Sequence, residues 1–301
     1  MNFRRLFNLS KPAKRFQGRR SQGLPGTLPV ARLERLEERA LLAGNVTAQL
    51  VGQTAFINGD AADNSVQILV DGGNVVVRGA DGTTINGSSN DFVLATGSTS
   101  IPGSLYASLD NGNDTFTIDG VTLPGNAFIS GGSGNDQIAV MGSSTISGNL
   151  HINGNSGADT ISLQNSTVGR NATILGARGA DTLIVSSATI GRDLYVSGGS
   201  NNDNIVVDNS RIGRDTTIVG LGGEDNIVLR DSVFVDDITI AGHGGNDIIV
   251  FDSSDVGDKS FIFGGGGRDN IQITGSSTFY DRLRTYGGGG RDNLETASTV
   301  T

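Results

Sequence analysis

The chain has 301 residues, a formal net charge of −9, no Cys, no Trp and 46 Gly, and this glycine share is about twice the usual one. The absence of cysteine excludes a disulfide framework and thiol chemistry. No apolar run reaches the roughly 18 residues that a membrane helix needs. Residues 1–44 carry ten Lys or Arg against three Glu, a balance of +7, so the remainder carries 12 basic and 28 acidic residues, or −16. An acidic body excludes nucleic acid as a partner, because phosphate backbones demand a basic face.

The first 29 residues are basic, rich in Gly and Pro, and without hydrophobic periodicity. This composition predicts a disordered segment. The segment opens like a targeting sequence but lacks the apolar stretch of a secretory signal, and a solvated basic tail is the alternative. Residues 30–42 follow with a helical pattern, because Leu33, Leu36 and Ala40 share one face of a helix.

Within that stretch, the residues Leu36–Leu42 read LEERALL. They resemble the LEPR-XLL segment that begins many large exported planctomycete proteins, with Glu38 standing where the proline of that family lies. The resemblance implies export. Residues 1–44 are therefore expected to be an export-related segment, and the protein is expected to be extracellular or on the cell surface.

Residues 45–112 are rich in strands at irregular spacing. The strands Ser65–Val70 and Asn74–Val77 are separated by an Asp-Gly-Gly turn, which predicts a hairpin. Asp63 and Asp91 each precede an apolar strand, as later aspartates do. These residues are expected to form irregular coils that open a larger β-domain spanning residues 45–301.

From the middle of the chain onward, one six-residue loop with the frame G-x-x-G-x-D recurs eight times, first as Gly131–Asp136. Asn201 replaces the second glycine once, and Leu109–Asp114 is a weaker version that precedes the others. A fixed period in the twenties is typical of a solenoid, in which each repeat is one coil stacked on the next. The closing aspartates are spaced by 22 or 23 residues: Asp114, Asp136, Asp159, Asp181, Asp203, Asp225, Asp247, Asp269 and Asp292.

Apolar residues recur two and four positions after each aspartate, which indicates a strand with one buried face. A short second strand and a third one before the next loop complete each coil, and a column of small residues that includes Ser143 and Ser276 follows the first strand. The pattern predicts an all-β, right-handed parallel β-helix of about ten coils, regular over residues 113–297. Ile161, Leu183, Ile205 and Ile227 should stack on one sheet.

Stacking would place the nine aspartates about 4.8 Å apart. Neighbouring charges would then repel by about 1 kcal/mol in water and by several times more inside protein. Calcium takes six to eight oxygen ligands, which carboxylates and loop carbonyls supply. All nine aspartates are therefore expected to hold Ca²⁺ along the loop edge, and an aspartate that only caps its turn is the alternative. Glycine is expected at the first loop position for its backbone angles, and Asn201 should weaken its site without abolishing it.

The loop with its following strand resembles the nonapeptide repeat G-G-x-G-x-D-x-U-x of the RTX, or hemolysin-type, calcium-binding proteins. Three segments fit the repeat at every fixed position: Gly131–Ala139, Gly264–Gln272 and Gly287–Glu295. The resemblance implies that the aspartates and loop carbonyls of stacked turns share calcium ions. In this chain one nonapeptide alternates with a 13-residue segment, so only one edge would carry ions.

A second column lies 11 residues after the loop aspartates and consists of Arg170, Arg192, Arg214, Asp236 and Asp258. Arg192 and Arg214 are each followed directly by an aspartate, Asp193 and Asp215. These adjacent opposite charges predict a solvated salt-bridge ladder that contributes little to stability.

Catalysis is not expected, since His151 and His243 fall in different coils and neither has a Ser or Cys partner by spacing. The expected function is that of a secreted or cell-surface, calcium-binding structural or adhesive solenoid, with cell-surface polysaccharide or other envelope proteins as candidate partners. A polysaccharide lyase or hydrolase and a metal-free spacer are the alternatives. An adhesin should expose aromatic side chains on one face, and the sequence offers one cluster, formed by Phe279, Tyr280 and Tyr286.

Overall fold

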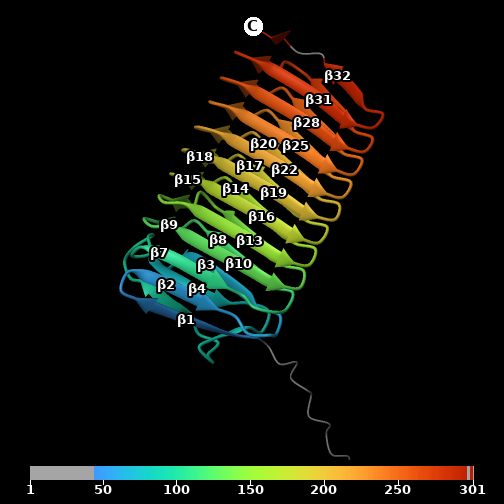
Figure 1. Cartoon of the computed structure of the whole chain (residues 1–301). Coiled ribbons are helices and arrows are strands. Elements are labelled where there is room, and N and C mark those ends of the chain that lie inside the picture. The colour runs from blue at the N-terminus through green and yellow to red at the C-terminus, as the bar shows by residue number, and fades with distance from the viewer. Residues whose placement is uncertain (1–43, 297–298, 301) are drawn as a thin grey trace, which may run out of the picture. The chain divides into compact units, whose positions relative to one another are not determined.

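The computed structural model describes residues 44–296 and 299–300, so the expected disordered segment and the helix over residues 30–42 lie outside the described residues. The described part of the chain contains strands and turns and no helix. It folds as a parallel β-solenoid, in which nine coils carry three strands each among the described residues (Figure 1). The all-β solenoid and its 22-residue period are thus confirmed.

The first of three sheets, the long-strand sheet, consists mainly of seven-residue strands. Each seven-residue strand ends in the first three residues of a G-x-x-G-x-D loop, and β7 ends just before the weaker loop Leu109–Asp114, so this sheet leads the chain into every loop. Its strands are β7 (Ser104–Ser108), β10 (Ala127–Ser133), β13 (Leu150–Ser156), β16 (Ala172–Arg178), β19 (Leu194–Ser200), β22 (Thr216–Gly222), β25 (Ile238–Gly244), β28 (Ser260–Gly266) and β31 (Leu283–Gly289).

The second sheet, the medium-strand sheet, follows each loop aspartate directly and has strands of five residues, or four in the last. It consists of β8 (Thr115–Asp119), β11 (Gln137–Met141), β14 (Thr160–Gln164), β17 (Thr182–Ser186), β20 (Asn204–Asp208), β23 (Asn226–Arg230), β26 (Ile248–Asp252), β29 (Asn270–Thr274) and β32 (Asn293–Thr296).

The third sheet, the short-strand sheet, has two-residue strands. These are β9 (Thr122–Leu123), β12 (Thr145–Ile146), β15 (Thr167–Val168), β18 (Thr189–Ile190), β21 (Arg211–Ile212), β24 (Val233–Phe234), β27 (Asp255–Val256), β30 (Thr278–Phe279) and β33 (Thr299–Val300).

Like residues stack in every sheet. On the medium-strand sheet Ile161 pairs with Leu183, Leu183 with Ile205, and Ile205 with Ile227, as the sequence predicts. All four side chains are at most 1% exposed. The three sheets therefore enclose one continuous aliphatic core, in which each coil covers the apolar surface of its neighbours.

The first residues of the solenoid differ from the regular coils. Strands β2 (Thr54–Asn58) and β3 (Ser65–Asp71) extend the long- and medium-strand sheets in parallel with β7 and β8. Three further strands are added by antiparallel pairing: β1 (Asn45–Val51) on β2, β4 (Asn74–Gly79) on β3, and β6 (Phe92–Ala95) on β4. The short strand β5 (Thr84–Ile85) pairs in parallel with β1 at the edge of the long-strand sheet. The expected hairpin is confirmed, while part of the region forms an antiparallel cap in place of irregular coils.

The 23-residue coils have their extra residue in the turn that follows the strand of the medium-strand sheet. Most 22-residue coils turn there with one left-handed polar residue, such as Asn209 at φ 46°, and the coil that starts at Asp114 has Gly120 at φ 65°. The coil between Asp136 and Asp159 has Gly142 and Ser143 there, both at positive φ, so the buried serine is Ser144. The prediction of Ser143 and Ser276 for the small-residue column was therefore wrong, because the inserted residue shifts it to Ser144 and Ser277.

Candidate metal centre

The aspartates that close the loops lie inside the solenoid. Asp114 and seven of its successors are 1–2% exposed, and the last, Asp292, is half-buried. The aspartates thus form a row at the loops, and their carboxylates are withdrawn from water. The cause is the strand alternation, since Asp136, Ile138 and Val140 occupy alternate positions and share one inward face.

Hydrogen bonds link the buried carboxylates into one column, which we call the Asp ladder. The backbone N–H of each ladder aspartate except the last, Asp292, donates to Oδ1 of the aspartate one coil further on. These N–O distances are 2.9 Å for Asp114 to Asp136, 2.8 Å for Asp136 to Asp159 and 2.7 Å for Asp159 to Asp181, and the later ones are 2.8–3.1 Å. Every Oδ1 thus caps a turn, as the alternative hypothesis requires.

The other carboxylate oxygen is different. Oδ2 is buried and has no hydrogen-bond partner in eight ladder members: Asp114, Asp136, Asp159, Asp181, Asp203, Asp225, Asp247 and Asp269. Turn capping does not account for this oxygen. A buried ionised carboxylate is costly unless it is fully compensated, so a proton or a cation is needed at each Oδ2.

The first glycine of every loop makes room for this oxygen. A Cβ built on Gly131 would overlap Oδ2 of Asp136, and the same holds for the first glycine of the other seven loops. The predicted reason for this glycine was wrong, because no positive φ occurs at the first loop position. Left-handed angles occur instead at the second and fourth positions, as at Gly132 and Gly134. Asn201, at the fourth position, adopts φ 80°, as its tolerance of left-handed geometry predicts.

A backbone carbonyl approaches the same place from the next coil. The carbonyl oxygen of Gly154 lies 2.9 Å from the Cβ position built on Gly131. At Gly176, Gly242 and Gly264 the corresponding distances to the next coil's glycine carbonyl are 2.5–2.6 Å. The pairing of the long-strand sheet also skips this position, since Ser130 pairs with Asn153 and Gly132 with Asn155 while Gly131 has no pair.

Burial raises the pKa of the ladder carboxyls. The pKa rises to about 6 for Asp114 and Asp247, and to about 7 for Asp159 and Asp203. The largest cause is desolvation, which the hydrogen bond from the neighbouring N–H opposes. For Asp136, Asp181, Asp225 and Asp269 the pKa is likewise raised by burial. A carboxyl whose pKa lies at about 6 or 7, as for Asp159 and Asp203, is present in both the protonated and the ionised form near neutral pH. A cation could take the place of the proton there.

The donor set of the ladder fits a metal ion of the hard type. It consists only of oxygens, namely an unpartnered Oδ2 and, beside it, the glycine carbonyl of the next coil. Hard cations prefer such ligands. The structure thus brings together all nine predicted aspartates, although Asp292 is the least enclosed.

Two aspartates of the irregular region do not join the ladder. Asn64 takes the position that would precede Asp114, and its N–H donates to Oδ1 of Asp114 at 2.7 Å. Asp63 accepts instead from the N–H of Asn113 at the loop surface, and Asp91 pairs with Arg78 at 2.6 Å. The ladder therefore begins with an amide.

A second group of carboxylates lies in the column of Arg170 and its successors, for which the sequence predicts ion pairs and no metal. Asp236, Asp237 and Asp258 are half-buried, and one oxygen of each lies within 4.8 Å of the others. The 22-residue spacing of Asp236 and Asp258 could have indicated it. Lys259 already compensates the group, with Nζ 3.6 Å from Asp237 and 3.4 Å from Asp258. Of the predicted salt-bridge column, Arg214 pairs with Asp193 at 3.9 Å, whereas Arg170 and Arg192 form no ion pair among the described residues. The three carboxylates could hold a metal only in competition with Lys259.

The chain matches no protein-family model, no curated protein and no solved structure. The resemblance of its loops to RTX repeats therefore stays a prediction. Across residues 44–296 and 299–300, no helix has the length and apolar character to span a membrane.

Proposed function

We propose that the protein is a non-catalytic, calcium-binding structural solenoid, in which Ca²⁺ ions bind along the Asp ladder between adjacent loops. The observation that carries the proposal is the set of eight buried Oδ2 atoms without a hydrogen-bond partner. One oxygen of each carboxylate is satisfied by the fold, and the other faces a place that a glycine carbonyl of the next coil also approaches in several loops.

The ligand chemistry favours calcium over other metals. Zinc prefers Cys and His, but the chain has no Cys and only two His, neither of which is in the ladder. Magnesium demands a near-ideal octahedron and usually retains several waters, whereas calcium accepts irregular shells of carboxylate and carbonyl oxygens. A row of divalent ions would also offset the repulsion between carboxylates that stacking holds about 4.8 Å apart.

Calcium binding would be coupled to folding. The aspartates are 22 or 23 residues apart in the chain, so only the stacked coils bring the ligands together. An ion that binds the folded state alone stabilises it by about 2.7 kcal/mol per site at a hundredfold excess over Kd. Several such sites would make the ordering of the coils strongly dependent on calcium.

Such a dependence suits a protein that leaves a compartment poor in calcium for one that is rich in it. The resemblance of residues 36–42 to LEPR-XLL supports export to the cell surface or beyond. Deleting residues 1–44 is expected to abolish extracellular delivery while leaving the melting temperature of the solenoid unchanged. Normal secretion of the truncated protein would contradict this assignment.

The metal proposal is tested by thermal unfolding at pH 7.5 in millimolar calcium and in excess EGTA. We expect calcium to raise the melting temperature of the parent protein. The variant Asp203→Asn with Asp225→Asn should lose part of that increase, because amides bind calcium more weakly than carboxylates. The matched control is Asp236→Asn with Asp258→Asn, which removes the same charge at the same spacing from the surface.

The control should retain the full effect of calcium. If the parent protein has the same melting temperature in calcium and in EGTA, the calcium proposal is wrong. The ladder aspartates would then only cap turns, and the protein would be a metal-free spacer. If the calcium effect is lost in the control variant and kept in the ladder variant, calcium binds at the carboxylates beside Lys259 and not in the ladder.

A further inference from the structure

The outer face of the long-strand sheet carries a row of rings at its N-terminal end. Phe56, Tyr106, Phe128 and His151 extend from four neighbouring strands, β2, β7, β10 and β13. The ring centroids are 5.6 Å apart for Phe56 and Tyr106 and 4.8 Å for Tyr106 and Phe128, with the planes within 15° of parallel. The ring of His151 follows at 6.2 Å. The rings therefore form a ridge that runs along the solenoid axis.

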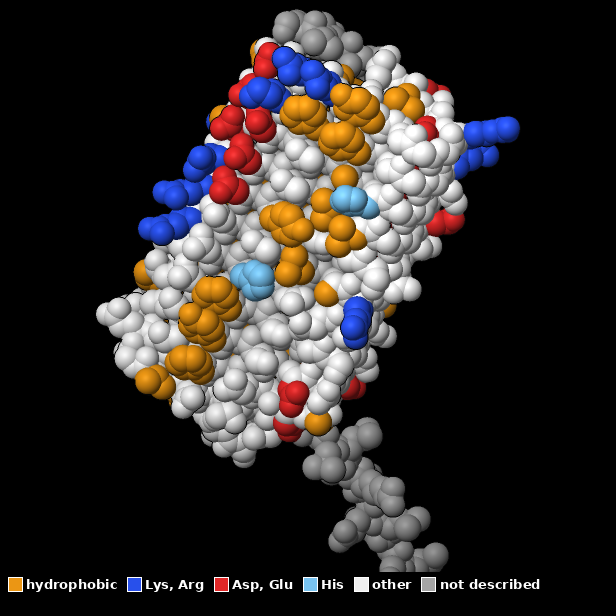
Figure 2. All heavy atoms as spheres, in the orientation of Figure 1, with side chains coloured by type: hydrophobic (Ala, Val, Ile, Leu, Met, Phe, Trp, Pro, Cys, Tyr) orange, Lys and Arg blue, Asp and Glu red, His pale blue; other side chains and the backbone are white. Residues whose placement is uncertain are grey.

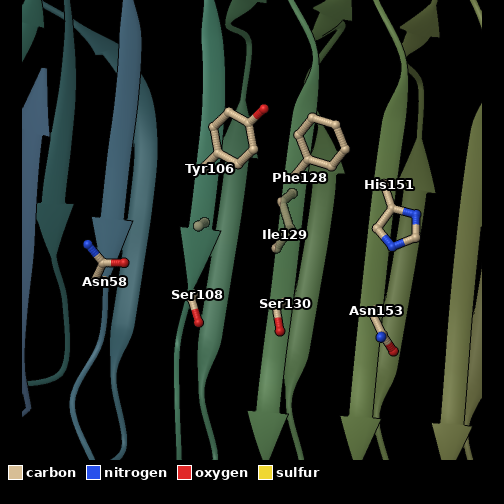
Figure 3. Close-up of a pocket in the computed structure, with 9 residues that line it drawn as sticks. Asn58, Tyr106, Ser108, Phe128, Ile129, Ser130, His151 and Asn153 are labelled. Carbon is tan, nitrogen blue, oxygen red and sulfur yellow. The ribbon is translucent and has the colours of Figure 1, made fainter. Parts of the chain in front are cut away.

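A row of polar side chains runs beside this ridge. Asn58, Ser108, Ser130 and Asn153 lie two positions further along the same strands, so they point to the same side of the sheet. Figure 3 shows the rings of Tyr106, Phe128 and His151 in one row and these amides and hydroxyls in a second. Except for Phe56, the side chains of both rows line a groove of about 270 Å³.

The groove contains no acidic side chain, Lys or Arg among its nine lining residues. This is notable on an acidic protein, since residues 45–301 carry a balance of −16. An anionic ligand would be repelled by the body, and a cationic one would find no carboxylate in the groove. The charge distribution thus selects a neutral ligand that has both an apolar face and hydrogen-bonding edges.

We propose that this groove binds a neutral polysaccharide chain lying along the solenoid axis. The inference goes beyond the calcium proposal and does not depend on it. A pyranose ring offers a face of C–H groups and a rim of hydroxyls. The C–H face complements the negative π face of Tyr106 and Phe128, and the hydroxyls complement Asn58, Ser108, Ser130 and Asn153. Because the fold repeats both rows once per coil, successive sugars of one chain would meet equivalent partners.

The exposure of these side chains supports a binding role. Tyr106 is 43% exposed, and Figure 2 shows hydrophobic side chains gathered on this face of the solenoid. The aromatic cluster expected from the sequence does not form such a surface, because Phe279 is fully buried while Tyr280 and Tyr286 are exposed. The rings of Phe261, Phe263 and Tyr286 gather further along the same face, but there Arg284 continues the outer row in place of a ring.

The test is isothermal titration calorimetry on the full chain in millimolar calcium, with cellohexaose, mannohexaose and chitohexaose as neutral probes and hexagalacturonate as the anionic control. We expect at least one neutral hexasaccharide to bind and hexagalacturonate not to bind. Tyr106→Leu with Phe128→Leu keeps apolar side chains but removes the rings, and it should weaken binding at least tenfold. Tyr195→Leu is the matched control, since Tyr195 is an exposed tyrosine of the same outer row on β19.

Melting temperatures of all variants establish that each is folded. The proposal is overturned if no neutral hexasaccharide binds, if hexagalacturonate binds best, or if Tyr195→Leu weakens binding as much as the double variant. Failure of the calcium proposal would be recognised separately, because it concerns the melting temperature of Asp-ladder variants and not saccharide binding.

Discussion

The backbone N–H of Asp203 donates a 2.8 Å hydrogen bond to Oδ1 of Asp225, one coil further on, while Oδ2 of each of the two carboxylates stays buried without a partner. The two oxygens of one side chain thus have different roles. Oδ1 belongs to the architecture, since it ties one loop to the next. Oδ2 requires a proton or a cation, and this requirement leads to the predictions that follow.

Without calcium, the stability of the solenoid should fall as the pH rises. The pKa of the buried ladder carboxyls lies above the unfolded value of 3.8, at about 6 for Asp114 and about 7 for Asp159 and Asp203. Between pH 4 and pH 7 the folded state therefore binds more protons than the unfolded state, and the free energy of unfolding decreases as these protons leave. The stabilising contribution is complete below about pH 4 and is lost above about pH 7.

Urea unfolding in EGTA from pH 4.5 to 8 measures this slope. The net negative charge of the body acts in the same direction, so the control is Asp203→Asn with Asp225→Asn, which should flatten the dependence. A free energy of unfolding that rises with pH over this range would contradict the account.

Replacing the first glycine of a loop should be far more damaging than replacing the third residue of the same loop. In Gly220→Ala the new methyl group would overlap Oδ2 of Asp225, whereas in Gly222→Ala its nearest neighbour is the Gly199 carbonyl at 4.0 Å. Neither glycine has a positive φ, so the comparison isolates the space that the carboxylate needs. We expect Gly220→Ala to lower the melting temperature by several degrees and Gly222→Ala to leave it nearly unchanged. Similar values for both variants would exclude a steric role for the first glycine.

The core of the C-terminal coils should depend on a buried aromatic stack. Phe251 is fully buried, with ring centroids 6.0 Å from Phe234 and 5.2 Å from Phe279. Phe251→Ala should cost about 3–5 kcal/mol, the usual range for removing a buried ring. Phe261→Ala, which removes an outward-pointing ring on β28, should cost much less in chemical denaturation. Equal costs would indicate that the inner faces of the sheets do not dominate stability.

The sequence predicts the solenoid well because residues at equivalent positions of neighbouring coils contact one another. The 22-residue period of the sequence is therefore also the period of the contacts. The columns of Ile161 and Leu183 follow directly from spacing. The inward direction of the aspartates could also be predicted, since Asp136, Ile138 and Val140 alternate along one strand. The prediction of a calcium row did not specify whether the carboxylates are buried. The position of Oδ2 under Gly131 depends on left-handed angles at Gly132 and Gly134, which a motif alone does not specify.

The antiparallel strands at the N-terminal end of the solenoid could not be predicted, because they do not follow the 22-residue repeat. The antiparallel strands β4 and β6 have no counterpart in the nine regular coils that the structure describes. The residues that form these strands also separate Phe56 from Tyr106 by 50 positions. A 22-residue period therefore does not predict the contact between these two rings. The contacts from Tyr106 to Phe128 and His151 do follow the period and could have been found.

The most direct test of the central claim is the number of calcium ions bound per chain, measured by equilibrium dialysis with radioactive calcium at pH 7.5. Nine aspartates leave eight positions between adjacent loops, so the account predicts several ions and at most about eight in the ladder. Asp203→Asn with Asp225→Asn should bind fewer ions, and Asp236→Asn with Asp258→Asn should bind as many as the parent. A parent protein that binds no calcium, or a ladder variant that binds as much as the parent, would contradict the account.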